Sequence, residues 1–448
     1  MGAAAQFARA TWLAGAVVVV GGGLGWLWLR HWGRVPFSVP SLPWYHCFPF
    51  YVFPHPVLAP GWALVALPVA LGVTVAVVAM ARREIVWPVR LAASAAAALV
   101  LALAVSALGG GPRAWWAPLD YAGEYPAGAH LVGEIPSFLR RFPGLLPALP
   151  THAQGHPAGA MAFYGLVARV RPGLPAAAAA TIAVGALGAV AAGALARDEL
   201  GARGGRLAVA LWTLSPGVVL YVATSADAVF ATVLGLAALA AHRGLVRRSW
   251  AWTVAGGALL WAGSMLTYAA VLLLVFLLVQ AGGRLRAEPG WVVCWAAGTA
   301  AVVLGLVAAL WLATGYDPLA ALRAVHRAYQ GAPGSARRPA LPWVPGDLLA
   351  FGGMLGVPLL GALVARGVVV VRERAWASVD AAALATLLAA SSWGFSRGEV
   401  ERVFQFLVPL VLIPAARQLL DWRARLPVLA ALLLAQVLAV QVLFATRW

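Results

Sequence analysis

Residues 61–81 read GWALVALPVALGVTVAVVAMA, and two arginines, Arg82 and Arg83, follow directly. A helix needs about 20 apolar residues to cross the hydrocarbon core of a bilayer, and this stretch supplies them without a charged side chain. Its apolar residues are continuous rather than alternating, which favours a helix over a strand of a β-barrel. The stretch therefore predicts a transmembrane helix.

Similar stretches recur along the whole chain, which is 62% hydrophobic and only 10% charged. In ordinary globular proteins about a quarter of the residues are charged. The candidate spans lie near residues 12–30, 61–81, 91–110, 174–196, 207–223, 225–242, 250–263, 265–282, 290–314, 347–371, 378–394, 404–420 and 426–445. Residues 250–282 could instead form one kinked span. The sequence thus predicts an all-α, polytopic membrane protein with about thirteen transmembrane helices.

The formal net charge of +17 comes with no lysine at all, because the 32 basic residues are all arginine. They are scattered between the spans, which is typical of topology signals and lipid-phosphate contacts and speaks against a nucleic-acid-binding domain. Cys47 and Cys294 are far apart, so we expect neither a disulfide framework nor a metal cage. Residues 12–30 exceed a signal-peptide core in length, and we expect a membrane anchor there.

The arginines also predict an orientation in the plasma membrane. They lie on short connections after alternate spans: Arg82, Arg83 and Arg90; Arg197, Arg203 and Arg206; Arg243, Arg247 and Arg248; Arg284 and Arg286; Arg372 and Arg374; Arg417, Arg423 and Arg425. The positive-inside rule places these connections and the N-terminus in the cytoplasm. The longer connections 31–60, 111–173, 315–346 and 394–403 then fall on the outer face. Since the inner connections are too short for a nucleotide-binding domain, we expect any chemistry outside.

The chain therefore divides into three parts. Residues 1–110 hold N-terminal spans, residues 111–173 form an outer segment, and residues 174–448 form the main transmembrane bundle with the outer loops 315–346 and 394–403. In the outer segment we expect a short amphipathic helix near Ile135–Phe142 and an interfacial helix from Gly159 to about Val170. Because polar residues concentrate there, the outer segment is the first candidate for an active site.

Two acids of the outer segment, Asp120 and Glu124, are spaced by one helical turn, so both carboxylates could face one cavity. One could take the proton of an attacking hydroxyl, and the other could orient a substrate or a divalent cation. Tyr121 and Tyr125 beside them are suited to stacking against a sugar. The alternative is that both acids are simply solvated loop residues.

His152 and His156 flank a second polar stretch in the same segment. Gly155 and Pro157 disfavour a helix there, so the two imidazoles are not expected to bind zinc from one helix face. A turn that presents them to a phosphate or a sugar is the better interpretation. We assign no metal site from the sequence.

Charged residues also occur where later spans begin on the outer face. Asp227 near the start of one span is explained at least in part by the helix dipole. Glu399, Glu401 and Arg402 precede another span, where charges are costly unless they are paired or functional. Arg402 could hold a lipid phosphate through its fork, with Glu401 or Glu399 fixing the fork. Contact with lipid headgroups is the alternative.

Further cations lie in the outer loop 315–346, namely Arg323, Arg327, Arg337 and Arg338. They could assist in binding an anionic substrate. Like Arg402, they could equally contact lipid headgroups.

Four motifs occur in a fixed order: Pro-Thr-His-Ala-Gln-Gly-His-Pro-Ala-Gly at 150–159, Ala-Thr-Ser-Ala-Asp-Ala at 223–228, Ala-Arg-Arg-Pro at 336–339 and Gly-Glu-Val-Glu-Arg at 398–402. Over roughly residues 110 to 448 the chain resembles polytopic glycosyltransferases of the GT-C superfamily, in particular actinobacterial integral membrane proteins of that type. The resemblance implies a polyprenyl-phosphate-linked sugar donor and an outer-loop acid as base, for which Asp120 and Glu124 are the matching candidates. The chain departs from the common pattern, because its acids are not adjacent and their loop follows the third span.

The resulting expectation is an enzyme that moves a sugar from a lipid-phosphate donor to a glycan, lipid or protein acceptor on the outer face, with no assigned cofactor. A flippase or transporter of a lipid-linked glycan is an alternative, and it would favour charges spread through the spans and paired broken helices. A non-catalytic membrane assembly subunit is a third interpretation.

Overall fold

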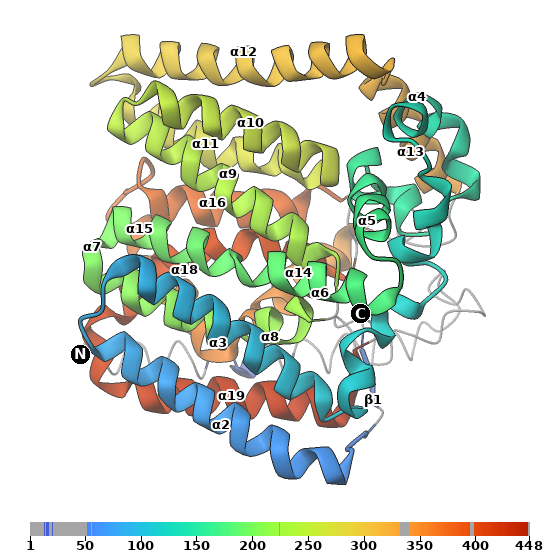
Figure 1. The fold of residues 1–448 in the computed structure, drawn as a ribbon. Helices are drawn as coiled ribbons and strands as arrows, with labels where there is room; N and C mark the ends of the chain where they lie inside the picture. The colour runs from blue at the N-terminus through green and yellow to red at the C-terminus, as the bar shows by residue number, and fades with distance from the viewer. Residues whose placement is uncertain are drawn as a thin grey trace.

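The computed structural model describes residues 13, 15–17, 20, 52–54, 56–223, 225–331, 340–394 and 398–446. Most of the first predicted span and the candidate residues Arg337 and Arg338 lie outside the described residues. The described chain is a bundle of long, roughly parallel and antiparallel helices with a smaller helical layer at one end (Figure 1).

The N-terminal half contains the helices α2 (Pro60–Arg82), α3 (Trp87–Ala107), α4 (Ile135–Leu145), α5 (Ala158–Val170), α6 (Leu174–Ala186), α7 (Gly188–Leu214), α8 (Pro216–Val222) and α9 (Asp227–Arg247). Its short 3-10 helices are η1 (Gly111–Trp115), η2 (Ala117–Asp120), η3 (Tyr125–Leu131), η4 (Leu146–Ala148) and η5 (Ala153–Gly155). The two helices predicted for the outer segment are thus confirmed as α4 and α5.

The C-terminal half contains α10 (Trp250–Leu266), η6 (Tyr268–Leu272), α11 (Leu273–Leu285), α12 (Pro289–Thr314), α13 (Pro318–Gly331), α14 (Ala340–Leu355), α15 (Val357–Arg372), α16 (Val379–Ser392), α17 (Val400–Val403), η8 (Phe404–Leu407), α18 (Val408–Leu419), η9 (Leu420–Arg425) and α19 (Leu426–Leu443). Two three-residue strands, β1 (Val52–Pro54) and β2 (Phe444–Thr446), pair antiparallel. They join the chain before α2 to the end of α19.

Eight helices in the described part of the chain are long and apolar enough to cross a membrane. They are α2, α3, the stretch Leu174–Leu214, α9, the stretch Tyr268–Leu285, α12, the stretch Val400–Trp422 and α19. The all-α, membrane-embedded architecture is therefore confirmed, whereas the count of about thirteen spans stays a prediction. The stretch Leu174–Leu214 combines residues that we assigned to two spans, and Gly201 interrupts its helical backbone with a φ of 71°.

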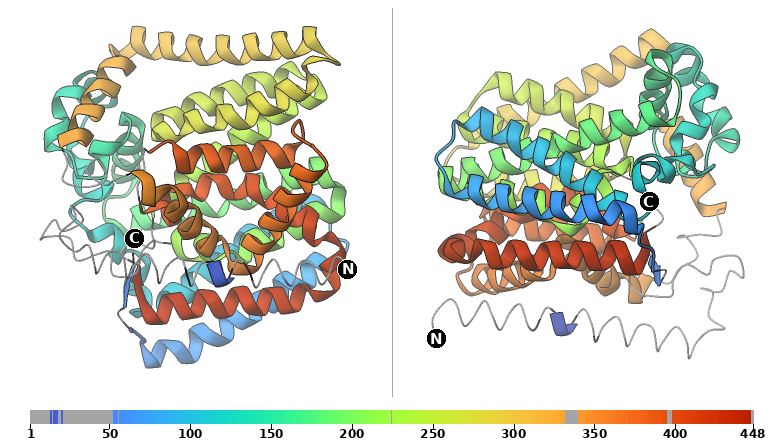
Figure 2. Two further views of the ribbon diagram at one scale, coloured as in Figure 1. Left: turned by 180° about the vertical axis from the view of Figure 1, so that it is seen from behind. Right: turned by 60° about the horizontal axis from the view of Figure 1, so that its bottom comes forward.

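Two outer segments predicted from the sequence lie at the same end of the bundle. Helix α4 packs against α13, and α5 packs against the end of α10. In Figure 1 these elements gather on the right, and α12 runs from the opposite end of the bundle to α13. The view from behind in Figure 2 shows the same arrangement. Residues 111–173 and 315–331 therefore share one end.

Small residues let the spans approach closely, as is common in membrane bundles. A Cβ atom added to Gly256 of α10 would lie 2.8 Å from the Ala241 backbone of α9. A large core of mostly alanine, leucine and valine fills the bundle around α7, α9 and α18. A second, aromatic core, including Phe138, Tyr164 and Phe230, joins the outer segment to the start of α9. This second core positions the candidate site.

The sidedness of this bundle is testable. A reporter fused at Arg247 is expected to score cytoplasmic, and one inserted within residues 111–158 is expected to score extracytoplasmic, because arginine-bearing connections are retained inside. Alkaline phosphatase and green fluorescent protein fusions give opposite readouts and serve as each other's control. The reverse pattern would place the outer segment in the cytoplasm and remove the reasoning for an outer-face site.

Candidate functional site

The aromatic core brings the start of η3 next to the start of α9. Tyr125 stacks on Tyr164 with ring centroids 5.6 Å apart and an interplanar angle of 10°. Its ring also meets Phe230 of α9 edge-on at 5.9 Å. Since Glu124 directly precedes Tyr125, this packing fixes Glu124 in the same region as Asp227, the first residue of α9.

Glu124 is a buried carboxylate held by an imidazole. Its side chain is only 1% exposed, and Oε1 lies 2.9 Å from Nδ1 of His152. The other oxygen, Oε2, has no hydrogen-bond partner within the described part of the chain. Oε2 is itself buried, and a carboxylate oxygen without a partner can act as a general base toward a hydroxyl group that reaches it.

Arg402 lies between two carboxylates. Its Nη1 is 2.9 Å from Oδ2 of Asp227, and its Nη2 is 2.9 Å from Oε2 of Glu399. The Ser225 hydroxyl also donates to Oδ2 of Asp227 at 2.9 Å. Glu399 thus fixes the arginine fork, as we proposed for Glu399 or Glu401, and Asp227 has a cationic partner beyond the helix dipole. Glu401 is buried in the same short helix α17.

Glu399, which forms an ion pair with Arg402, has an unusual backbone conformation. Its φ of 62° lies in the left-handed region, and Gly398 before it has a φ of 86°. Non-glycine residues in this region are uncommon and cluster at functional sites. The Gly398 amide donates to Oδ1 of Asp347 at 3.0 Å. The sequence reasoning missed Asp347, although a buried acid at the start of an apolar stretch is itself a functional signal.

Two other residues in the aromatic core, Tyr125 and His156, have shifted pKa values. Burial raises the pKa of Tyr125 well above its usual value, and the charges of Asp227 and Glu124 raise it further. Burial lowers the pKa of His156, whose Nδ1 lies 3.1 Å from the Leu266 carbonyl and therefore donates to it. This hydrogen bond holds the His156 ring in place, and its contact with a phosphate or a sugar stays a prediction.

Asp120 differs from Glu124 in its exposure and in its local backbone. It ends η2 as an exposed residue, and Tyr121 after it is extended with a φ of −71° and a ψ of 134°. The expectation that Asp120 and Glu124 share one helical face is therefore wrong, because the backbone between them is not helical. Tyr121 is 47% exposed, and its ring centroid lies 6.3 Å from that of His152. This tyrosine is the candidate aromatic surface beside Glu124.

Only some of the arginines predicted to bind an anionic substrate lie within the described part of the chain. Arg323 and Arg327 are exposed on α13, whereas Arg337 and Arg338 lie outside the described residues. Among the residues that the structure describes, no group of three or more His, Cys, Asp or Glu side chains could hold a metal ion. The expectation that an acid could orient a divalent cation stays a prediction.

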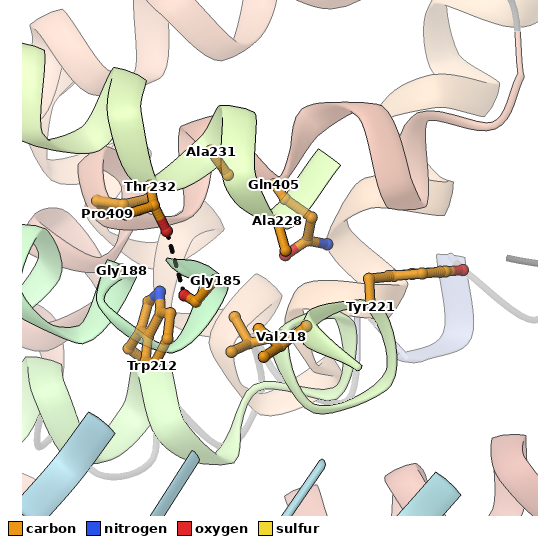
Figure 3. A pocket seen from close by; sticks show the side chains of 11 residues that line it. Gly185, Gly188, Trp212, Val218, Tyr221, Ala228, Ala231, Thr232, Gln405 and Pro409 are labelled. Carbon is orange, nitrogen blue, oxygen red and sulfur yellow. Dashed lines mark hydrogen bonds between the residues drawn. The ribbon is translucent and has the colours of Figure 1, made fainter. Parts of the chain in front are cut away.

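Two cavities differ in what they could hold. The first, of about 20 Å³, lies inside the bundle and is lined by Gly185, Gly188, Trp212, Tyr221 and Gln405 among others. Figure 3 shows it, with the Thr232 hydroxyl donating to the Gly185 carbonyl at 3.1 Å. Such a volume suits about one water molecule. It excludes a sugar or a lipid from this place.

The second cavity is an apolar groove of about 530 Å³ between α10, η6, α11 and α12. It is lined by Leu260, Ser264, Thr267, Tyr268, Ala270, Val271, Leu274, Leu277, Leu278, Trp295, Ala296, Thr299, Ala300, Val303 and Leu304. Leu278 and Leu304 are each 67% exposed, so the groove opens sideways from the bundle. Its lining residue Thr267 directly follows Leu266, whose carbonyl accepts the His156 hydrogen bond. The groove therefore begins beside the polar site.

Comparisons of the chain with models of protein families, with curated proteins and with solved structures give no match. The interpretation of the site thus depends on its geometry and on the sequence motifs.

Proposed function

We propose that this protein is a membrane glycosyltransferase of the GT-C type, which transfers a sugar from a polyprenyl-phosphate donor to an acceptor hydroxyl on the extracytoplasmic face. The observation that carries the proposal is the buried Glu124 with one unbound carboxylate oxygen, next to the Asp227–Arg402–Glu399 cluster. The adjoining apolar groove supports a lipid-linked substrate, because its lining offers almost only hydrocarbon surface.

In the proposed reaction Glu124 Oε2 takes the proton of the acceptor hydroxyl. The acceptor oxygen then bonds to the anomeric carbon of the sugar. The bond from that carbon to the phosphate oxygen breaks, and polyprenyl phosphate leaves with the bonding electron pair. Tyr121, the exposed ring beside Glu124, supplies a stacking surface for the sugar.

Arg402 is the proposed partner of the leaving phosphate. Both of its terminal nitrogens already bind carboxylates, and we propose that the phosphate takes the place of one of them. Glu399 is the more accessible partner, with a side chain 25% exposed against 6% for Asp227. Glu399 also has the strained backbone. We therefore assign the exchange to Glu399, while Asp227 keeps its contact with Arg402.

The test uses the purified protein in lipid vesicles with a radiolabelled polyprenyl-phosphate sugar and a panel of soluble and lipid acceptors. Transfer of the label to an acceptor supports the enzyme. Movement of the donor across the bilayer without transfer would favour the flippase, and neither activity would favour an assembly subunit. Either of the last two results overturns the proposal.

Filling the groove should weaken use of the donor lipid. Ala300 lines the groove, and Ala301, its neighbour on α12, is exposed and does not line it. We expect Ala300→Trp to raise the KM for the polyprenyl donor about tenfold or more, because a blocked chain site forfeits about 0.8 kcal/mol for each methylene group left unburied. Ala301→Trp should leave the KM unchanged. Equal KM values for the two variants would exclude the groove as the site of the lipid chain.

A further inference from the structure

Hydrogen bonds of both the backbone and the side chains link the turn that contains His152 to the turn that contains Glu124. The His152 amide donates to the Gly123 carbonyl at 3.0 Å, and the Glu124 amide donates to the Tyr121 carbonyl at 2.9 Å. A Cβ atom on Gly123 would lie 2.5 Å from the Tyr121 ring, so a larger residue there would displace this ring. The imidazole therefore meets the carboxylate from a fixed direction.

The hydrogen bond between them has a defined polarity. An ionised carboxylate only accepts hydrogen bonds, so in the ionised pair Nδ1 of His152 is the donor to Oε1 of Glu124. A carboxylate that is 1% exposed is costly in its charged form unless it is hydrogen-bonded. Among the residues that the structure describes, His152 supplies the one side-chain hydrogen bond to Glu124. His152 thus holds Oε1 of this buried carboxylate.

We propose that His152 is a positioning residue for Glu124. It holds Oε1 and turns Oε2 toward the acceptor hydroxyl, so that Glu124 can accept a proton. The inference rests on the proposed function and assigns His152 a different role from the one expected from the sequence, in which its imidazole contacted a phosphate or a sugar.

The test replaces the imidazole by amides of two lengths. His152→Asn keeps an N–H donor on the atom next to Cγ, where Nδ1 lies, whereas His152→Gln moves the donor one bond farther and His152→Ala removes it. We expect His152→Asn to retain most of kcat and His152→Ala to lose about 10- to 100-fold, because misplacing a reacting group by about 1 Å costs about 10²-fold. The KM for the donor should stay unchanged. His130→Ala, an exposed histidine of η3, is the matched control and should behave like the wild-type protein.

A second readout does not need activity. Dicyclohexylcarbodiimide attaches to protonated carboxyl groups in apolar surroundings, and mass spectrometry of the peptide that contains Glu124 counts the product. Glu124 should be labelled faster in His152→Ala than in the wild-type protein and in His152→Asn, because its carboxyl group is no longer held by a hydrogen-bond donor. This result would hold even if no sugar is transferred, which separates the inference from the proposed function.

Two outcomes overturn the inference. Equal loss of kcat in His152→Asn and His152→Ala would mean that the imidazole itself is required. An unchanged rate of Glu124 labelling in His152→Ala would mean that His152 does not hold the Glu124 carboxyl group.

Discussion

Glu124→Gln is expected to lower the rate of sugar transfer by about 10²- to 10⁴-fold, which is the usual cost of removing a general base. The amide has nearly the shape of the carboxylate but cannot take the acceptor proton. Asp120→Asn, four positions earlier, should keep nearly full activity, because Asp120 is exposed and lies outside the buried cluster. Initial rates with a polyprenyl-phosphate sugar in lipid vesicles measure both variants.

Size-exclusion profiles of the two variants control for folding. A large loss in Asp120→Asn together with full activity in Glu124→Gln would reverse the assignment and make Asp120 the base. Full activity in both variants would show that this segment does not supply the base at all.

Arg402→Met is expected to destabilise the protein by about 3–5 kcal/mol, because removing one partner of a buried ion pair leaves an uncompensated charge. Here the buried Asp227 loses this partner, and Glu399, whose side chain is 25% exposed, loses its contact with the same guanidinium. The loss appears as a lower free energy of unfolding in denaturant titrations of the protein in mixed micelles.

Arg206→Met is the matched control. Its partner Glu84 is 91% exposed at a distance of 3.3 Å, and exposed ion pairs contribute about 0–1 kcal/mol. Adding Asp227→Asn to Arg402→Met should recover part of the stability, because the second change removes one of the unpaired charges. Equal losses for Arg402→Met and Arg206→Met would show that the buried cluster contributes no more than a surface pair.

Apolar helices such as α2 could be predicted because one property decides them, the length of an apolar run. Helix α2 begins one residue before the predicted stretch 61–81 and ends one residue after it. The helices α4 and α5 were also predicted, and α4 carries Ile135, Phe138, Leu139 and Phe142 at helical spacing. The prediction for Asp120 and Glu124 was wrong because spacing in sequence has meaning only if the backbone is helical, and Tyr121 is extended.

The sequence indicated which residues belong to the candidate site but not which of them contact one another. Four polar residues stand out in apolar stretches of the sequence, namely Glu124, His152, Asp227 and Arg402. Their pairing depends on packing between distant segments, such as Tyr125 on Phe230, and a single sequence does not contain that information. The groove was not predictable either, because residues that line it and residues that face lipid are equally apolar.

The sideways opening of the groove beside α12 affects how a lipid-linked substrate would arrive. Only 11% of the most apolar part of α12 is buried, so the groove is reached from within the membrane plane. A substrate that enters there diffuses in two dimensions. The fraction of grooves that it occupies then depends on its mole fraction among the lipids and not on its concentration in the bulk solution. Diluting the vesicles with buffer would then leave turnover unchanged, while diluting the donor with inert phospholipid would slow it.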